Sequence, residues 1–253
     1  MKAAEIAQRR KEITEWLYQE ESIKVARLVA YFHVSDETIR KDLAYLEKEG
    51  VLRKEHGKAV LVKEKELAPV SLRTVNLKEK ERIVAKALEL ISENDRVIGM
   101  DQGSTIALLA KQLLSFDQRQ IFTGSLAAIL QLIKGHHLVH SFGGQYSAGD
   151  MAFRNDTGKE MYPDVQFDLC FFGSSGVKNR KGFCTSSLVD AESKRMMLRK
   201  SLKKVVLLDN SKFETTSLVQ VAPWSEVDIV IANKGIPHSY ERMISAFAQL
   251  ILV

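Results

Sequence analysis

The sequence predicts an α/β protein of two domains: a small N-terminal domain of helices closed by a β-hairpin, and a larger C-terminal domain with a mostly parallel sheet. Its 253 residues suit a small domain followed by a larger one. The first part shows helical hydrophobic periods, whereas the second alternates short apolar strands with helices. A charged run that ends in Pro69 separates them. We therefore expect domains at 1–62 and 77–253, joined by a linker at 63–76.

The N-terminal domain is expected to begin with two helices. Apolar residues recur between charged ones over 3–20, which predicts the first helix. A short extended piece at 22–23 follows, and the inward spacing of apolar residues predicts the second helix over 24–32. Residues 33–34 then form a turn between helices.

A third helix is predicted over 35–49. Ser35 is a favourable N-terminal capping residue, and two acids in the first turn suit the positive end of the helix dipole. Ile39, Leu43 and Leu46 recur at the spacing of one buried face. The glycine that follows the helix is a typical stop signal. The remaining face of this helix is polar and basic.

Residues 51–62 alternate in polarity around a tight turn, which predicts a β-hairpin. Three helices closed by a hairpin make a winged helix-turn-helix, whose third helix is suited to lie against DNA. The residues expected to bind bases and phosphates are Ser35, Thr38, Arg40, Lys41, Arg53, Lys54, His56 and Lys58. The alternative is a small helical domain whose solvated charges serve protein contacts.

The composition excludes several other classes of protein. The formal charge of +5, from 37 basic and 32 acidic residues, does not by itself demand nucleic acid, so DNA binding rests on where the charges lie. Cys170 and Cys184 are too few for a disulfide framework and lack metal-ligand spacing, so we expect packed thiols and no metal site. The first residues show no apolar signal segment, and no apolar run approaches the ~18 residues of a membrane span. We expect a cytoplasmic protein without membrane association.

The C-terminal domain is expected to open with a helix over 77–92 and to continue as alternating strands and helices. The predicted strands are 97–101, 120–123, 138–142, 169–173, 205–209 and 229–232. The further predicted helices are about 104–115, 125–134, 187–201 and 239–250. This alternation implies a mostly parallel sheet covered on both faces.

Small and hydroxyl residues gather where predicted strands end and helices begin. Because the carboxyl ends of parallel strands share one edge, these loops are expected to converge on one crevice. Free backbone N–H groups and hydroxyls there form a cradle for a small anion. The residues expected to line it are Asp101, Gly103, Ser104, Thr105, Thr123, Ser125, Gly143, Gly144, Gly173, Gly176, Glu192, Lys194 and Lys212.

Simpler interpretations of these residues stay open. In each loop alone, the small and hydroxyl residues could serve only to form a tight turn, and Asp101 could cap its own loop. Glu192 and Lys194 could form an ordinary surface pair. A nucleotide is not indicated, since neither the dinucleotide-binding glycine pattern nor the P-loop pattern occurs.

With these motifs in place, nearly the whole chain resembles the DeoR-type family of bacterial sugar-operon repressors. The N-terminal resemblance is carried by Val34-Ser35, Thr38-Ile39-Arg40-Lys41-Asp42-Leu43, Leu46-Glu47, Gly50, and the wing around Arg53 and His56-Gly57. The C-terminal resemblance is carried by Asp101-x-Gly103-Ser104-Thr105, Gly143-Gly144, Gly173-x-x-Gly176, Gly182-x-x-Thr185 and Asp209-x-Ser211-Lys212-Phe213, with basic residues at Arg73 and Lys80.

The resemblance implies a sensor domain with the ribose-5-phosphate isomerase fold and a repressor function in carbohydrate metabolism. It also implies a phosphorylated sugar as the effector. The helix-turn-helix implies double-stranded operator DNA as a partner, and paired half-sites in DNA imply a homo-oligomer. No cofactor is expected. The chain departs from the family pattern at Lys58, where a second glycine is usual. It departs again at Val177-Lys178, where an acid is commoner, and at Gly124, where asparagine is usual.

The relationship to an isomerase raises the possibility of an enzyme. Aldose–ketose isomerisation needs a general base with acids and a lysine around it. The loop that corresponds to the isomerase's acid-rich loop is 173–176, which has no carboxylate, and Glu192 alone would lack partners. We therefore expect binding without turnover and no catalytic residues. A DNA-tethered isomerase is the alternative, and an interaction module with a vestigial crevice is a further one.

Overall fold

The computed structural model describes residues 3–20, 22–48, 52–55, 57–61, 76–154 and 164–253. The chain divides into two compact units, Met1–Leu67 and Ala68–Val253. Most of the predicted linker at 63–76, together with His56 and Gly50, lies outside the described residues. Among the described helices, none combines the length and apolar character needed to cross a membrane.

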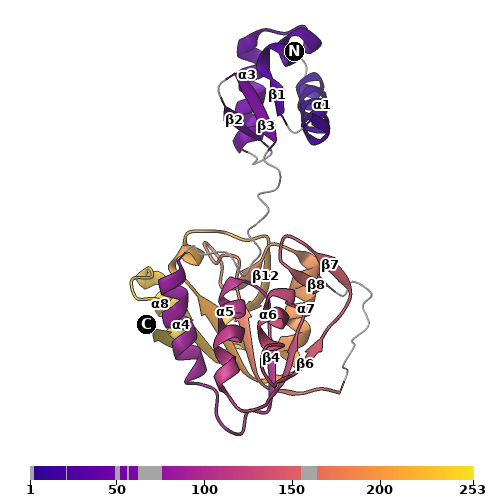
Figure 1. The fold of residues 1–253 in the computed structure, drawn as a ribbon. Helices are drawn as coiled ribbons and strands as arrows, with labels where there is room; N and C mark the ends of the chain where they lie inside the picture. The colour runs from indigo at the N-terminus through magenta and orange to yellow at the C-terminus, as the bar shows by residue number, and fades with distance from the viewer. Residues whose placement is uncertain (1–2, 21, 49–51, 56, 62–75, 155–163) are drawn as a thin grey trace. The chain divides into compact units, whose positions relative to one another are not determined.

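The N-terminal unit is three helices and a small antiparallel sheet (Figure 1, indigo to purple). Its elements are α1 Ala3–Glu20, β1 Ser22–Lys24, α2 Val25–Phe32, α3 Asp36–Lys48, β2 Leu52–Glu55 and β3 Lys58–Leu61. The extended piece predicted before the second helix is β1, which pairs with β3, so the sheet order is β1-β3-β2. His33 ends α2 in the left-handed conformation, with φ 52°, and turns the chain toward α3.

The core of this unit is formed by the apolar stripes that the sequence predicts. Ile39 and Leu43 of α3 pack with Leu28 of α2 and Ile13 of α1, and all four are at most 1% exposed. Ala59 of β3 closes the same cluster from the hairpin side. Burial of this stripe leaves the opposite face of α3 exposed, and that face carries the basic residues.

The C-terminal unit is built on a seven-stranded sheet in the order β14-β13-β11-β9-β4-β5-β6. The strands are β4 Val97–Met100, β5 Gln120–Thr123, β6 Leu138–Ser141, β9 Phe167–Gly173, β11 Ser201–Leu208, β13 Ile229–Ala232 and β14 Gln249–Leu252. Every neighbouring pair in this sheet is parallel. The carboxyl ends of all seven strands therefore lie at one edge.

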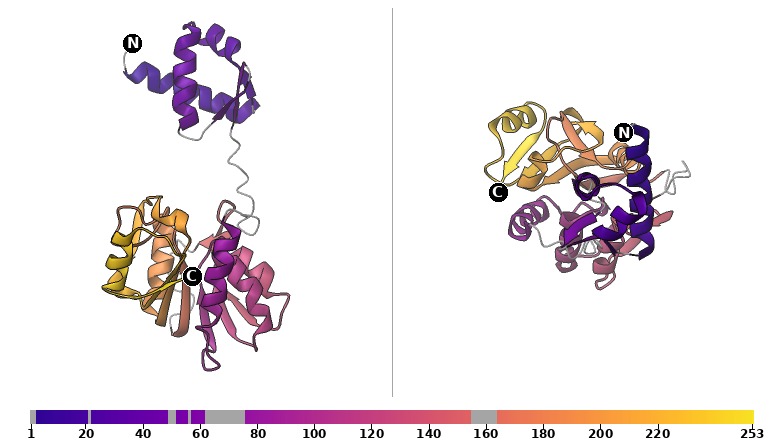
Figure 2. Two further views of the ribbon diagram at one scale, coloured as in Figure 1. Left: turned by 90° about the vertical axis from the view of Figure 1, so that its left-hand side faces the viewer. Right: turned by 90° about the horizontal axis from the view of Figure 1, so that it is seen from above.

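Two layers of helices cover this sheet, as Figure 2 shows from the side. The helices are α4 Leu77–Leu88, α5 Ser104–Gln112, α6 Leu126–Leu132, α7 Leu188–Arg199 and α8 His238–Ser245. Side chains of α4, α5 and α6 share one hydrophobic cluster with alternate residues of the strands. Side chains of α7 and α8 share the other cluster with the remaining alternate residues. In β11, for example, Val205 and Leu207 face the first layer, whereas Val206 and Leu208 face the second.

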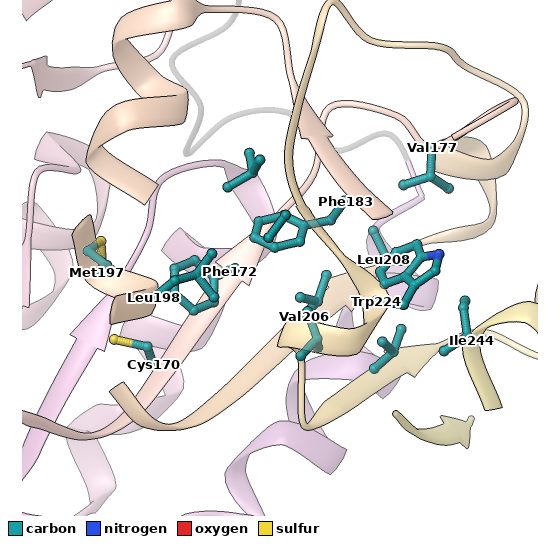
Figure 3. Close-up of a cluster of buried hydrophobic side chains, with 14 of the residues drawn as sticks. Cys170, Phe172, Val177, Phe183, Met197, Leu198, Val206, Leu208, Trp224 and Ile244 are labelled. Atoms are coloured by element: carbon teal, nitrogen blue, oxygen red, sulfur yellow. The ribbon is translucent and has the colours of Figure 1, made fainter. Parts of the chain in front are cut away.

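The second layer also contains a short antiparallel sheet that the sequence did not suggest. Its strands are β10 Gly182–Thr185 and β12 Val219–Pro223. Figure 3 shows Phe183 of β10 beside Phe172 of β9, and the ring centroids of these two residues are 5.6 Å apart. Trp224 follows β12 and is 1% exposed, so this addition completes the larger core.

Two predicted helices end earlier than expected. The helix predicted over 77–92 ends at Leu88, where the backbone N–H groups of Leu90 and Ile91 turn back onto Ala87 and Leu88. The helix predicted over 239–250 is wrong in its last part, because α8 ends at Ser245 and the chain becomes the edge strand β14. A further hairpin, β7 Gln145–Ser147 with β8 Ala152–Arg154, lies where no element was predicted.

Candidate DNA-binding surface and effector site

The recognition helix α3 begins with two interlocked hydroxyl side chains. Ser35 Oγ accepts a hydrogen bond from the backbone N–H of Thr38 at 3.2 Å and lies 2.9 Å from Thr38 Oγ1. Ser35 therefore caps the helix, as predicted, and both hydroxyls stay at the surface. They lie at the helix end that a helix-turn-helix presents to base edges.

Basic side chains follow on the exposed face of α3 and on the hairpin. Arg40 and Lys41 are 70% and 75% exposed, and Lys54 and Lys58 project from β2 and β3. The structure thus places these four cations on α3 and the adjoining wing. The side chain of Arg53 and the whole of His56 lie outside the described residues.

A buried carboxylate that sequence reasoning did not single out for a function holds α1 against α3. Asp42, with 2% side-chain exposure, accepts hydrogen bonds from Arg9 Nε at 2.6 Å and Arg10 Nε at 2.8 Å. The Arg10 guanidinium also lies 3.8 Å from the centre of the Tyr45 ring. Because Asp42 is on α3 and both arginines are on α1, this cluster sets the angle at which the recognition helix is presented.

At the carboxyl edge of the large sheet, a row of polar residues follows the strand ends. In sheet order these are Asn233 after β13, Asp209 after β11, Gly173 at the end of β9, Asp101 after β4 and Thr123 at the end of β5. Asp101 accepts a hydrogen bond from the backbone N–H of Gly173 at 2.9 Å, which joins the two central strand ends. The ends of β4 and β9 are therefore joined at this edge, as expected for neighbouring parallel strands.

The centre of this row is a buried cluster of charged residues. Lys194 Nζ donates a hydrogen bond to Asp101 Oδ2 and lies 3.6 Å from Asp190 Oδ2. The side chains of Lys194 and Asp101 are each 4% exposed, and that of Asp190 is 7% exposed. Gln102 Nε2 donates to Asp190 Oδ1 at 2.9 Å, and Thr185 Oγ1 donates to Asp190 Oδ2. One ammonium group is thus enclosed by two carboxylates.

Burial and charge act in opposite directions on this cluster. Burial raises the pKa of Asp101, an effect that the neighbouring Lys194 opposes. Burial also acts to lower the pKa of Lys194, but the carboxylates of Asp101 and Asp190 outweigh it and raise that pKa above its ordinary value. Lys194 therefore carries its charge at neutral pH.

The position of Lys194 follows from the register of α7. The core-facing side of α7 carries Ala191, Met197 and Leu198. Lys194 is buried on this helix as well, and Asp190 lies one helical turn before Lys194 on the same side. Glu192 lies on a different face of the helix, is 69% exposed, and binds Arg195 at 2.5 Å. The structure thus brings Lys194, but not Glu192, to the centre of the edge. The missed acid is Asp190, and its four-residue spacing from Lys194 was the available signal.

Several predicted hydroxyls are used by the fold itself. Thr123 Oγ1 donates to the carbonyl of Asp101 at 3.4 Å and accepts from the N–H of Ser125 at 3.0 Å. Ser125 caps α6 by accepting from the N–H of Ala128. Thr123 and Ser125 are both 0% exposed, so they shape the loop from within it.

The glycines of the edge differ in the room around them. Gly103 precedes α5 with φ +115°, and a Cβ built there would meet nothing within 4 Å. A Cβ at Gly176, in contrast, would lie 2.2 Å from the carbonyl oxygen of Thr215, so Gly176 serves close packing. Gly143 and Gly144 have φ 62° and 101° and continue the chain beyond β6.

The first turn of α5 leaves donors at this edge. Ser104 and Thr105 follow Gly103, and the first backbone N–H groups of a helix have no acceptor within the helix. Within the described part of the chain, the Ser104 hydroxyl has no hydrogen-bond partner. Lys212 lies in the short helical turn Asn210–Phe213 after β11, and its carbonyl accepts from the N–H of Val177 at 2.7 Å.

The start of the C-terminal unit is attached to the same edge. Asn76, which precedes α4 with φ 56°, donates from Nδ2 to Asp209 Oδ1 at 3.1 Å. Asp209 Oδ1 also accepts from the N–H of Ser211 at 3.0 Å, and its residue is 1% exposed. Asn233 Nδ2 donates to the carbonyl of Glu79 at 3.1 Å. The N-terminal end of α4 is therefore anchored to the turn that carries Lys212.

Comparison with known proteins identifies both units. Residues 9–65 match the family model of the DeoR-like helix-turn-helix domain, and residues 75–234 match that of the DeoR C terminal sensor domain. Among solved structures, ribose 5-phosphate isomerase A from Methanocaldococcus jannaschii is similar, at 17% identity and a TM-score of 0.41, over 54% of each chain.

Relatives match along nearly their whole length. The L-fucose operon activator of Haemophilus influenzae is 31% identical over 91% of this chain and 93% of that protein. The putative aga operon transcriptional repressor of Escherichia coli O157:H7 is 28% identical over 98% of this chain and 94% of that protein. The lactose phosphotransferase system repressor of Staphylococcus epidermidis is 29% identical over 95% of this chain and 96% of that protein. With its helix-turn-helix and its sensor domain both matched, the chain belongs to the DeoR family of DNA-binding transcription regulators.

Proposed function

We propose that this regulator represses a carbohydrate-use operon and that a phosphorylated sugar, bound at the carboxyl edge of the sheet, controls it. The observation that carries the proposal is the combination of the Asp101–Lys194–Asp190 cluster with the open first turn of α5 beside it. Relatives named for fucose, aga and lactose systems support a carbohydrate operon. Two of these three are named as repressors and one as an activator, which favours repression.

The phosphate is assigned to the first turn of α5. The backbone N–H groups of Gly103, Ser104 and Thr105 point out of the N-terminal end of a helix, where the helix dipole also favours an anion. The Ser104 hydroxyl adds a donor, and Lys212 adds a charge from the neighbouring turn. A side chain at Gly103 would stand between the ligand and these donors.

The sugar hydroxyls are assigned to the buried cluster. Carboxylates accept hydrogen bonds from hydroxyl groups, and Asp101 and Asp190 are the acids that lie at the centre of the edge. Lys194 Nζ donates to Asp101 and lies beside Asp190, so it holds both carboxyl groups in place for the sugar hydroxyls. Because one part of the site binds the phosphate and another binds the sugar hydroxyls, the site can distinguish a phosphorylated sugar from inorganic phosphate.

The signal leaves this site through Asn76 and Asp209. Lys212 lies three residues after Asp209, and Asp209 holds Asn76 at the start of α4. Asn76 is also the first described residue after the segment that joins the two units. A ligand that draws Lys212 toward it therefore acts on the attachment of that segment. For regulation, the ligand must bind two arrangements of the protein with different affinity.

A homo-oligomer is part of this proposal. Helix-turn-helix proteins read paired half-sites with paired recognition helices. Analytical ultracentrifugation of the purified protein, with and without operator DNA, tests this part. A monomer in both samples would contradict it.

A thermal-shift screen against phosphorylated and free sugars tests the effector proposal. A ligand present at a hundred times its Kd stabilises the fold by about 2.7 kcal/mol. We expect a shift with one phosphorylated sugar, no shift with its free form, and a smaller shift in the variant Lys212→Met. The matched control is Lys86→Met, which removes an exposed lysine of α4. No shift with any phosphorylated sugar would contradict the proposal.

An isomerase is the second candidate, because acids and a lysine do meet at the edge. Against it, Lys194 is enclosed by its two partners, and Glu192 is turned to the surface and bound to Arg195. Both carboxyl groups of this cluster are already engaged by Lys194, which leaves neither free to act as a general base. Aldose–ketose conversion of the sugar phosphate identified in the screen decides the question, and turnover by the purified wild-type protein would establish the enzyme.

A further inference from the structure

The described cations of the predicted DNA-binding surface lie beside carboxylates. Each of the four predicted DNA-binding cations that the structure describes is paired with an acid of the same surface. The pairs are Arg40 with Asp36, Lys41 with Glu37 at 2.8 Å, Lys54 with Glu47 at 2.8 Å, and Lys58 with Glu55 at 3.0 Å. The eight groups together have no net charge.

The sequence spacing keeps these opposite charges together. Asp36 and Glu37 lie one helical turn before Arg40 and Lys41 on α3, and Glu55 lies across the hairpin turn from Lys58. Exposed ion pairs are individually weak and exchange with water. The acids nevertheless remain within a few ångströms of the cations when a pair opens, because backbone geometry holds them there.

The pairing also affects protonation. The hydrogen bond from Lys41 lowers the pKa of Glu37, and the hydrogen bond from Lys54 lowers the pKa of Glu47. The hydrogen bond to Glu37 raises the pKa of Lys41 in turn. Glu37 and Glu47 therefore stay negatively charged at neutral pH while DNA approaches.

We propose that Asp36, Glu37 and Glu55 are specificity-determining residues, which lower the affinity for nonspecific DNA by holding the cations of this surface in internal pairs. A lysine that moves from a carboxylate to a phosphate releases one counterion from DNA. The carboxylate that it leaves loses its partner and stays close to a phosphate backbone of the same charge, which offsets part of the gain from that release. Nonspecific DNA offers only phosphates, whereas an operator adds base contacts that favour the exchange.

Glu47 has a second role and is set apart from the other acids. Its Oε1 accepts a hydrogen bond from the backbone N–H of Lys54 at 3.0 Å, while its Oε2 binds the Lys54 ammonium. Glu47 therefore fastens the wing to α3. A change at Glu47 would move the wing as well as the charge, so the test uses the other three acids.

The test measures binding to a labelled mixed-sequence duplex by fluorescence anisotropy over a series of KCl concentrations. The full-length protein is compared with Asp36→Asn/Glu37→Gln and with Glu55→Gln. We expect tighter binding at low salt in both variants. The slope of log K against log[KCl] should steepen, by up to roughly 0.9 for each cation that is freed to neutralise a phosphate. An operator selected from random DNA by the wild-type protein should be preferred less strongly by both variants.

The control variant is Glu89→Gln, which removes the same charge from an exposed pair with Lys86 in the other unit. It should leave affinity and slope unchanged. Asp36 and Glu37 also stabilise the start of α3, so circular dichroism checks the double variant, and Glu55→Gln gives an independent reading from the hairpin. Unchanged or weaker nonspecific binding in folded Glu55→Gln and in the folded double variant would overturn the proposal.

Discussion

Lys194 owes its place in the fold to Asp101 and Asp190. A buried charge that loses its partner is costly, typically about 3–5 kcal/mol. We therefore expect Lys194→Met to lower the free energy of unfolding by about 3–5 kcal/mol in urea denaturation. The matched control is Lys86→Met, whose side chain is 36% exposed, and its effect should stay within about 0.5 kcal/mol. An equal effect of the two substitutions would show that the cluster does not stabilise the fold.

The pH dependence of this variant has a definite sign. Without Lys194, nothing opposes the effect of burial on Asp101, so the pKa of this carboxyl rises further. A carboxyl whose folded pKa exceeds its unfolded value favours the folded state at low pH and loses this contribution as the pH rises. Lys194→Met should therefore regain stability relative to the wild type as the pH is lowered from 7 toward 5. In the wild type, the contribution of Lys194 is lost only above its ordinary pKa of 10.5.

Both thiols are expected to be inert in the folded protein. Cys170 and Cys184 are free and 0% exposed, and burial raises their pKa values to about 12 and about 11. Since the thiolate is the reactive form, an aromatic disulfide reagent at pH 8 should release no product from the native protein and two equivalents in guanidinium chloride. If a thiol of the native protein reacted at the rate of a free cysteine, the structure that buries it would have to open locally.

At the level of elements, local patterns predicted most of the fold. The boundaries of α1, α2 and β5 agree with the sequence to within a residue, because each has a clear hydrophobic period between polar ends. The parallel sheet also follows from the alternation of strands and helices, and with it the row of strand ends at one edge. For this reason the sequence could place the candidate site at that edge.

The elements that were missed depend on partners far along the chain. β14 is a strand because β13 offers its free edge, and a short apolar run after α8 does not reveal this locally. β10 likewise pairs with β12, which lies well beyond α7 in the sequence. A short strand is specified by its partner as much as by its own residues.

Side-chain roles within the site were harder to predict than its position. Ser125 and Thr123 have the composition of anion-binding residues, but their hydroxyls are used to cap and close a loop. Asp190 was missed because its importance depends on the face of α7 that packs inward. Sequence periodicity gives that face only when Ala191, Met197 and Leu198 are weighed together. Burial of a charge is a property of the packed structure.

At the scale of the whole molecule, regulation requires that the sensor unit alter the segment that leads to the DNA-binding unit. Asn76 is the first described residue after that segment, and it donates a hydrogen bond to Asp209 at the edge where we propose that the effector binds. Coupling between two ligands through such a contact is typically about 1–3 kcal/mol, and it acts equally in both directions. Disrupting the contact should therefore reduce coupling while leaving each site able to bind.

We expect Asn76→Ala to bind the effector and DNA separately with affinities close to those of the wild type, but to lose most of the effect of one on the other. The measurement is DNA affinity by anisotropy with and without saturating effector, combined with effector affinity by calorimetry with and without DNA. Asn94→Ala is the control. Asn94 is an exposed asparagine between α4 and the start of β4, so it does not lie at the carboxyl edge of the sheet. A wild-type change in DNA affinity in Asn76→Ala would exclude this route. Loss of effector binding itself would instead assign Asn76 to the site, because coupling cannot be measured for a ligand that no longer binds.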